Sequence, residues 1–179
     1  MPNCLMTTGK IRETTMANKN DFTPEECTKV LESIIAAGIA VSAVHPSGWW
    51  GTLKEAAAGL PALAAVKRDP NSNELIKAAV ADFERSKDGN ILAMRERFAQ
   101  AAPTESVQRS LASLREVTAI IDTKAPDEAA AFKTWLREIS QKVAEAAVEG
   151  SFFGLGGVRV SDAETATLRD ISKALGLGS

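Results

Sequence analysis

The sequence is poor in the residues on which catalysis and metal binding most often depend. Its 179 residues include one histidine, two cysteines and no tyrosine. His45, the single histidine, would have to supply any imidazole chemistry alone, because the neighbouring Ser47 is too close along the chain to be oriented as a triad partner. We therefore interpret His45 as a cap at the end of a helix or as part of an interaction surface.

The two cysteines, Cys4 and Cys27, are too few for a disulfide framework or a zinc cluster. Such sparse usage is typical of a reducing compartment, and we expect a cytoplasmic protein. Residues 1–21 contain neither the apolar run of a signal peptide nor the periodicity of a helix. We expect them to form a disordered leader, in which Met1 and Met16 are alternative starts.

Neither sign of charge dominates the chain. It carries 21 lysines and arginines against 23 aspartates and glutamates, a formal net charge of −2. This balance lacks the basic footprint of a nucleic-acid-binding protein. No apolar run approaches the roughly 20 residues that span a bilayer. We expect protein partners, with a homo-oligomer and peripheral membrane association as alternatives, and no cofactor other than a candidate divalent cation.

The apolar residues recur at helical spacing, and no segment shows sustained period-two alternation. This pattern predicts an all-α single domain over residues 22–179, a bundle of about seven to eight helices. The first helix has Thr23 as N-cap, Pro24 at its first position and Glu26 at its third, and it should stop before Pro46. The others are expected over 50–58, 62–67, 73–85 and 91–101, after Pro103, after Pro126, and over 162–175.

Three of the predicted helices carry clear apolar stripes. We expect them to form the core. Their members are Val107, Leu111, Leu114, Val117 and Ile121; then Phe132, Trp135, Leu136, Ile139, Val143 and Ala147, with Lys133 outward; and finally Ala166, Leu168, Ile171 and Leu175, with Gly176 as C-cap.

A glycine-rich loop precedes the last helix. Two phenylalanines run into Gly154, Gly156 and Gly157, and successive backbone N–H groups near a helix start can cradle an anion. The loop lacks the flanking strand of a dinucleotide fingerprint and the Gly-Lys-Ser/Thr of a P-loop. A tight turn anchored by the two aromatic residues is the interpretation we favour over an anion or ligand site.

Acidic residues lie at two helix starts. Ser161 and Glu164 have the spacing of a capping box, and Asp162 lies between them. Acidic side chains at a helix start are also stabilised by the helix dipole. A divalent cation needs several oxygen ligands that converge, and the fold would have to bring Asp127 to Asp162 and Glu164. We favour the cap and keep the cation site as an alternative.

Trp49 and Trp50 form a second candidate for function. Adjacent tryptophans are frequent anchors of protein interfaces, so the pair is a candidate interaction surface. Together with Phe152 and Phe153 they would instead line an apolar pocket for a small ligand or a lipid.

The pattern F-x-G-x-G-G-x-R-V-S-D-A-E over residues 152–164, followed by an amphipathic helix ending in A-L-G, resembles the C-terminal region of bacterial tellurite-resistance TerB-like proteins. The helical layout of residues 22–176 fits the same family. The resemblance implies an all-helical bundle of about seven helices and a non-enzymatic role in bacterial stress response, with proposed metal sensing and membrane-bound partners. Family members often carry an Asp-Gly turn where this chain has Gly156-Gly157, so only Ser161 and Glu164 carry over.

Overall fold

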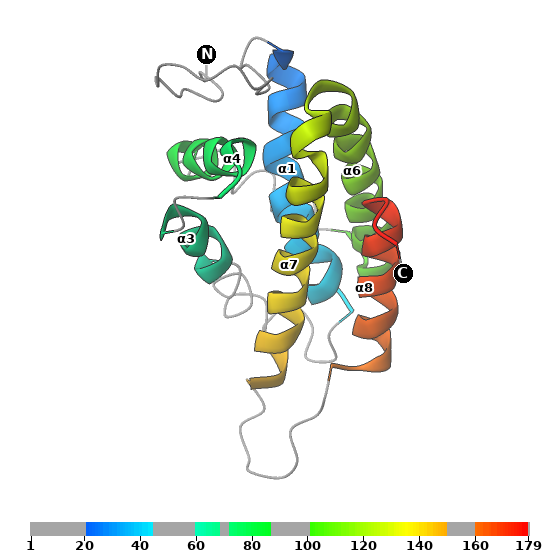
Figure 1. The fold of residues 1–179 in the computed structure, drawn as a ribbon. Coiled ribbons are helices and arrows are strands. Elements are labelled where there is room, and N and C mark those ends of the chain that lie inside the picture. Colours follow the sequence, from blue (N-terminus) through cyan, green and yellow to red (C-terminus); the bar gives the residue numbers. More distant parts are fainter. Residues whose placement is uncertain (1–20, 45–59, 69–71, 87–100, 150–159, 179) are drawn as a thin grey trace.

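The computed structural model describes residues 21–44, 60–68, 72–86, 101–149 and 160–178. This part contains six helices and no strand, which confirms the all-α prediction (Figure 1). The predicted count of seven to eight is not reached within it. The helices expected over 50–58 and 91–101, and leader residues 1–20, lie outside the described residues. The six helices are α1 (Pro24–Ser42), α3 (Leu60–Arg68), α4 (Glu74–Arg85), α6 (Pro103–Lys124), α7 (Pro126–Glu149) and α8 (Asp162–Ala174).

Proline marks the start of three of these helices, as predicted. α1 begins at Pro24 with a complete capping box, in which Glu26 N–H donates to Thr23 Oγ1 over 3.2 Å and Thr23 N–H donates to Glu26 Oε2 over 2.7 Å. α6 and α7 begin at Pro103 and Pro126. The missing N–H and fixed φ of proline suit the first helical position, where the N–H has no partner within the helix.

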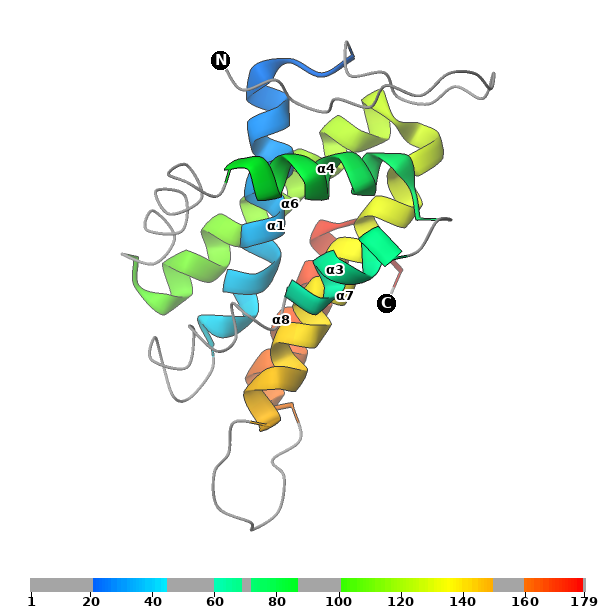
Figure 2. The same cartoon turned by 90° about the vertical axis from the view of Figure 1, so that its left-hand side faces the viewer.

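Four of the helices, α1, α6, α7 and α8, form a bundle in which each packs against the other three. α1 makes its most extensive contacts with α6 and α7, and α8 runs antiparallel to α7. The pair α3–α4 lies against one side of this bundle (Figures 1 and 2): α4 packs on α1 and α7, and α3 packs on α4 and α7. The molecule therefore has a four-helix bundle and a smaller side layer.

The predicted stripes supply the core of the bundle. Phe132, Leu114, Ile121, Leu136, Ile171 and Leu175 are among the largest side chains that are fully buried. The prediction for Ala166 is wrong, because this residue is exposed and Thr167 is buried in its place. At 3.6 residues per turn, Thr167 shares a face with Leu168 and Ile171, whereas Ala166 lies well off that face.

Small side chains bring α1 close to its neighbours. Ser33, Ala36, Ala37 and Ala40 of α1 are all fully buried. From α7, the fully buried Ser140 donates its hydroxyl hydrogen to the carbonyl oxygen of Ala37 over 2.8 Å. A hydroxyl that reaches the backbone of the next helix requires the two helices to lie close together. We call this contact the α1–α7 seam.

At the end of α8 the C-cap residue is Leu175, and the predicted Gly176 takes the next position, C′, where it terminates the helix. Its φ is +64°, a left-handed conformation that glycine adopts without a steric penalty. Gly176 N–H donates to Lys173 O over 3.1 Å, and Leu177 N–H donates to Ser172 O over 2.9 Å. These are the two hydrogen bonds of a Schellman motif, and they satisfy carbonyl groups that the helix leaves free.

The expectation that both cysteines are isolated is wrong for Cys27. Its side chain is buried and disulfide-bonded, so it is not a free thiol. The only other cysteine, Cys4, lies outside the described residues. Disulfides are typical of oxidising compartments, so cysteine usage no longer supports a cytoplasmic location. Within the described ranges, no helix is long and apolar enough to cross a membrane.

Candidate functional site

The start of α8 has the geometry that the capping-box spacing predicts. Glu164 N–H donates to Ser161 Oγ over 3.2 Å. In return, the Ser161 N–H and the Ser161 hydroxyl both donate to Glu164 Oε2, each over 2.8 Å. One oxygen of the Glu164 carboxylate is therefore fully used in capping the start of α8.

The other oxygen of this carboxylate is unusual. Glu164 is only 2% exposed, and within the described part of the chain its Oε1 has no hydrogen-bond partner. The preceding Asp162 is exposed. A buried acceptor without a donor is costly, and each such group in a native structure requires an explanation. Glu164 Oε1 is thus the atom of this helix start at which a cation or an added donor would be accommodated.

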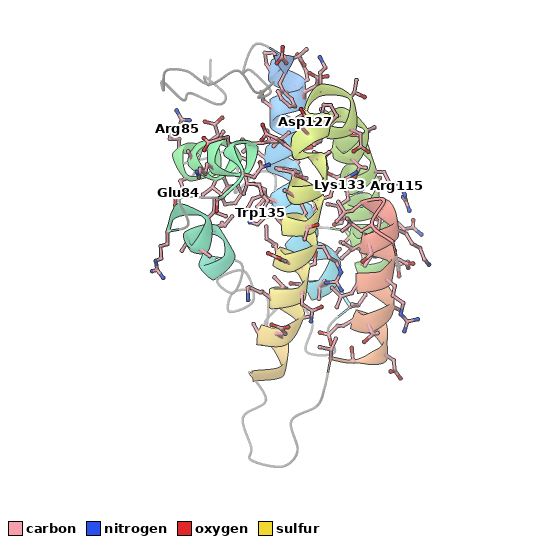
Figure 3. All side chains as sticks on the ribbon, in the orientation of Figure 1. Glu84, Arg85, Arg115, Asp127, Lys133 and Trp135 are labelled. Atoms are coloured by element: carbon pink, nitrogen blue, oxygen red, sulfur yellow. The ribbon has the colours of Figure 1, made fainter. Side chains whose placement is uncertain are left out.

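The candidate cation ligands do not meet. Asp127 lies at the start of α7, and Asp162 and Glu164 lie at the start of α8. Because α7 and α8 are antiparallel, their starts lie at opposite ends of the bundle (Figures 1 and 3). Throughout the described part of the chain, no group of three or more histidine, cysteine or acidic side chains could hold a metal ion. Any cation bound near Glu164 would need ligands other than Asp127.

The remaining candidate residues lie outside the described residues. These are the glycines of the proposed anion or ligand loop and the residues of the proposed interaction surface, namely Gly154, Gly156, Gly157, His45, Trp49 and Trp50. Their predicted roles stay predictions.

Glu128 has a role that the sequence analysis did not identify. It is the third residue of α7 and lies in the first turn of that helix. Its side chain is 9% exposed, and its Oε2 accepts the backbone N–H of Leu75 over 2.7 Å. Leu75 lies in the first turn of α4, where N–H groups have no partner within the helix. The neighbouring Ile76 N–H donates to the side chain of Asn73 over 3.1 Å. The bundle thus completes the cap of α4.

Trp135 is a second buried polar residue on the same side of α7. It lies two helical turns beyond Glu128, on the face of α7 that is turned toward α3 and α4 (Figure 3). The residue is 5% exposed, and its ring centroid lies 5.6 Å from that of Phe132. Its indole N–H has no hydrogen-bond partner among the residues that the structure describes. A buried indole N–H usually finds an acceptor, so this one is exceptional.

Ion pairs join the helices at the surface. Lys29 Nζ of α1 lies 2.6 Å from Glu116 Oε2 of α6, and Lys133 Nζ of α7 lies 2.6 Å from Asp122 Oδ1 of α6. The hydrogen bond to Glu116 raises the pKa of Lys29 above its usual value of 10.5, and the charges of Glu116 and Glu32 act in the same direction. Pairs of this kind orient helices but contribute little stability.

Several hydroxyl groups of the bundle make structural hydrogen bonds, whereas the fully buried Ser110 Oγ of α6 has no partner among the described residues. Ser33, Thr167 and Ser172 donate to carbonyl oxygens of their own helices. Arg137 of α7 donates to Ser172 Oγ of α8 over 3.0 Å, and Thr118 of α6 donates to Ala174 O of α8 over 3.3 Å. These hydrogen bonds stabilise a single helix or hold two helices together. None of them activates a hydroxyl group as a nucleophile.

Comparisons of the chain with family models, with curated proteins and with solved structures find no match. The TerB-like resemblance therefore rests on the sequence pattern of residues 152–164 and on the helical layout alone.

Proposed function

We propose that this chain is a non-enzymatic TerB-like helical protein of bacterial stress response, a module that acts through contacts with other proteins. The observation that carries the proposal is the segment from residue 152 to the end of α8. It combines the glycine-rich pattern of the resemblance with a capped amphipathic helix.

The described contacts support a scaffold role. The capping box at Ser161 and Glu164 has the spacing that the resemblance implies. The outward positions of α8 carry the exposed residues Asp162, Arg169, Asp170 and Lys173, a mixed-charge face that is open to solvent. The buried hydroxyls of Ser33, Ser140 and Thr167 donate to backbone carbonyl groups, a use that supports a structural role for these side chains.

Deleting the gene in its own host tests the proposal. We expect the deletion to lower the tellurite concentration that stops growth, and a plasmid copy of the full chain to restore it. Growth in the presence of an unrelated antibiotic serves as the control. The proposal fails if the deletion leaves tellurite tolerance unchanged. It also fails if the purified protein turns over a small molecule with a rate that depends on Glu164.

A divalent-cation-binding protein is the second candidate. The unpartnered, buried Glu164 Oε1, with Asp162 beside it, favours this function. The positive end of the α8 dipole opposes it, because a helix start favours anions. Calorimetry with Ca²⁺, Mg²⁺ and Zn²⁺ decides the matter: binding heat that the Glu164→Gln variant abolishes supports a cation site, and no heat at millimolar metal excludes one.

A further inference from the structure

The side layer, defined as α3 and α4, is attached to the bundle more weakly than the bundle helices are attached to one another. α3 and α4 span 9 and 12 residues, and helices this short are marginal alone and depend on packing for stability. Among the described residues, each bundle helix packs against the three others, and the contacts of α1 with α6 and α7 are extensive. The main contacts of the side layer with the bundle are much smaller: α3 packs on α7, and α4 packs on α1 and α7.

The attachment of α4 includes apolar contacts and a polar contact with α7. Leu75, Ile76, Ala79 and Val80 are the buried apolar residues of α4. The polar contact is the hydrogen bond from Leu75 N–H to the buried Glu128 carboxylate. This bond closes the first turn of α4 and fixes that turn to α7. It acts as a latch between the side layer and the bundle.

In the structure the side layer lies against the bundle, an arrangement that we call the closed state. In this state it also covers a group that would be more stable in water. The indole N–H of Trp135 is buried on the face of α7 turned toward α3 and α4, and it has no acceptor there. Water would supply this missing hydrogen bond if the side layer moved away. The penalty of an unpaired donor is therefore present in the closed state and absent in the open state.

We propose that α3 and α4 open from the bundle as one unit while α1, α6, α7 and α8 stay folded, and that opening breaks the Glu128–Leu75 latch and exposes Trp135. Local opening at a free energy below that of global unfolding is common for elements with few buried contacts. The closed state predominates because opening exposes the apolar residues of α4. The side layer is thus a cover over an aromatic face of α7, and this inference does not depend on the TerB-like function.

Hydrogen exchange of the full chain, followed by mass spectrometry, tests the opening. We expect peptides from α3 and α4 to exchange together, and at least about tenfold faster than peptides from α1, α6 and α7 after correction for intrinsic rates. Equal protection in all six helices would overturn the proposal. Fast exchange in α4 without α3 would also overturn it, because the pair would not be a unit.

Variants of Glu128 test the latch. Glu128→Ala removes the acceptor of the Leu75 N–H, and we expect exchange in α4 to become about tenfold faster with α1 and α6 unchanged. Glu128→Gln keeps an acceptor oxygen and should lie between this variant and the wild type. Glu138→Ala, an exposed change on the same helix, is the matched control. An equal increase in every helix would contradict the latch. If Glu128→Ala does not fold, the wild-type profile and Glu128→Gln decide.

Trp135 provides a second readout. In a Trp49→Phe, Trp50→Phe background, Trp135 is the only fluorescent tryptophan. We expect Glu128→Ala to increase the quenching of its fluorescence by acrylamide at urea concentrations where circular dichroism still reports a folded bundle. Quenching that rises only together with loss of the bundle would show that Trp135 becomes accessible by global unfolding, which would refute a separate opening.

Discussion

Replacing Glu164 by alanine and by glutamine separates the two roles open to this side chain. In the capping box, Oε2 accepts hydrogen bonds from the Ser161 N–H and hydroxyl. In a cation site, the charge of the carboxylate and the free Oε1 would carry the function. Alanine removes both roles. Glutamine keeps an acceptor oxygen for Ser161 and removes the charge.

The magnitudes follow from these contacts. Alanine loses two hydrogen bonds to a charged group, each about 1.5–3 kcal/mol, but it also releases a buried carboxylate from its desolvation cost. Because losing a helix cap typically costs about 0.5–2 kcal/mol, we expect Glu164→Ala to lower the free energy of unfolding by about 1–2 kcal/mol. For a chain of this length, this loss lowers Tm by about 2–8 °C.

Glutamine should be nearly neutral. Its loss of about 0.3–1 kcal/mol of favourable interaction with the helix dipole is offset by the absence of a buried charge. We expect Glu164→Gln to lie within about 0.5 kcal/mol of the wild type. Asp162→Asn, an exposed change in the same turn, is the matched control. Urea denaturation followed by circular dichroism, in EDTA and then with added Ca²⁺, Mg²⁺ or Zn²⁺, measures all four proteins.

Two results would refute the cap interpretation. The first is a Glu164→Ala variant as stable as the wild type, since the hydrogen bonds to Ser161 would then contribute nothing. The second is a Glu164→Gln variant as unstable as Glu164→Ala, with a difference from the wild type that grows when cation is added. A ligand that binds only the folded state stabilises that state in proportion to the logarithm of the ligand concentration. A stability difference that grows with added cation would therefore identify a bound metal.

Three further changes test the packing and electrostatics. Phe132→Ala empties a fully buried position and should cost about 3–5 kcal/mol in urea denaturation, and a loss below about 1 kcal/mol would contradict its place in the core. Gly38→Ala should stabilise α1 by about 0.5–1 kcal/mol, because the added Cβ would meet Val143 Cγ2 at an ordinary 3.8 Å, and lower stability would show that this space is absent. Lys29→Met removes the pair with Glu116. Because the folded-state pKa of Lys29 is raised above 10.5, its contribution to stability is complete below about pH 10.5 and is lost as the pH rises above that value. The stability advantage of the wild type over the variant should therefore shrink only above about pH 10.5, and a constant difference there would contradict this pairing.

The helices of the bundle were predictable because their signals are local. Pro24, Pro103 and Pro126 each mark a helix start, and the predicted stripes of α6 and α7 repeat at helical spacing over about four turns. In α8, Leu168, Ile171 and Leu175 are buried as predicted, and only the first member of the stripe, Ala166, is misassigned. Helix existence is thus readable from the sequence, and the edge of an apolar face near a helix end is less so.

The contacts of the candidate sites were predictable only where both partners lie within one turn. The bond between Ser161 and Glu164 joins residues three apart, and the spacing alone predicts it. The bond between Glu128 and Leu75 joins residues 53 apart, so no local pattern indicates it. The unpartnered N–H of Trp135 was equally hidden, because the apolar stripe explains the burial of the ring but says nothing about acceptors around it.

The α1–α7 seam has a consequence for how this fold can diverge. Ser140 reaches the backbone of Ala37, and Ala36 and Ala40 are fully buried in the same helix. A larger side chain at these positions would push the helices apart, whereas exposed positions elsewhere accept most residues. Sequence drift in the seam is therefore confined to glycine, alanine and serine, residue types so common that they leave little signal in a sequence comparison. Distant relatives of this chain would share a spacing of small residues long after the recognisable side chains had changed.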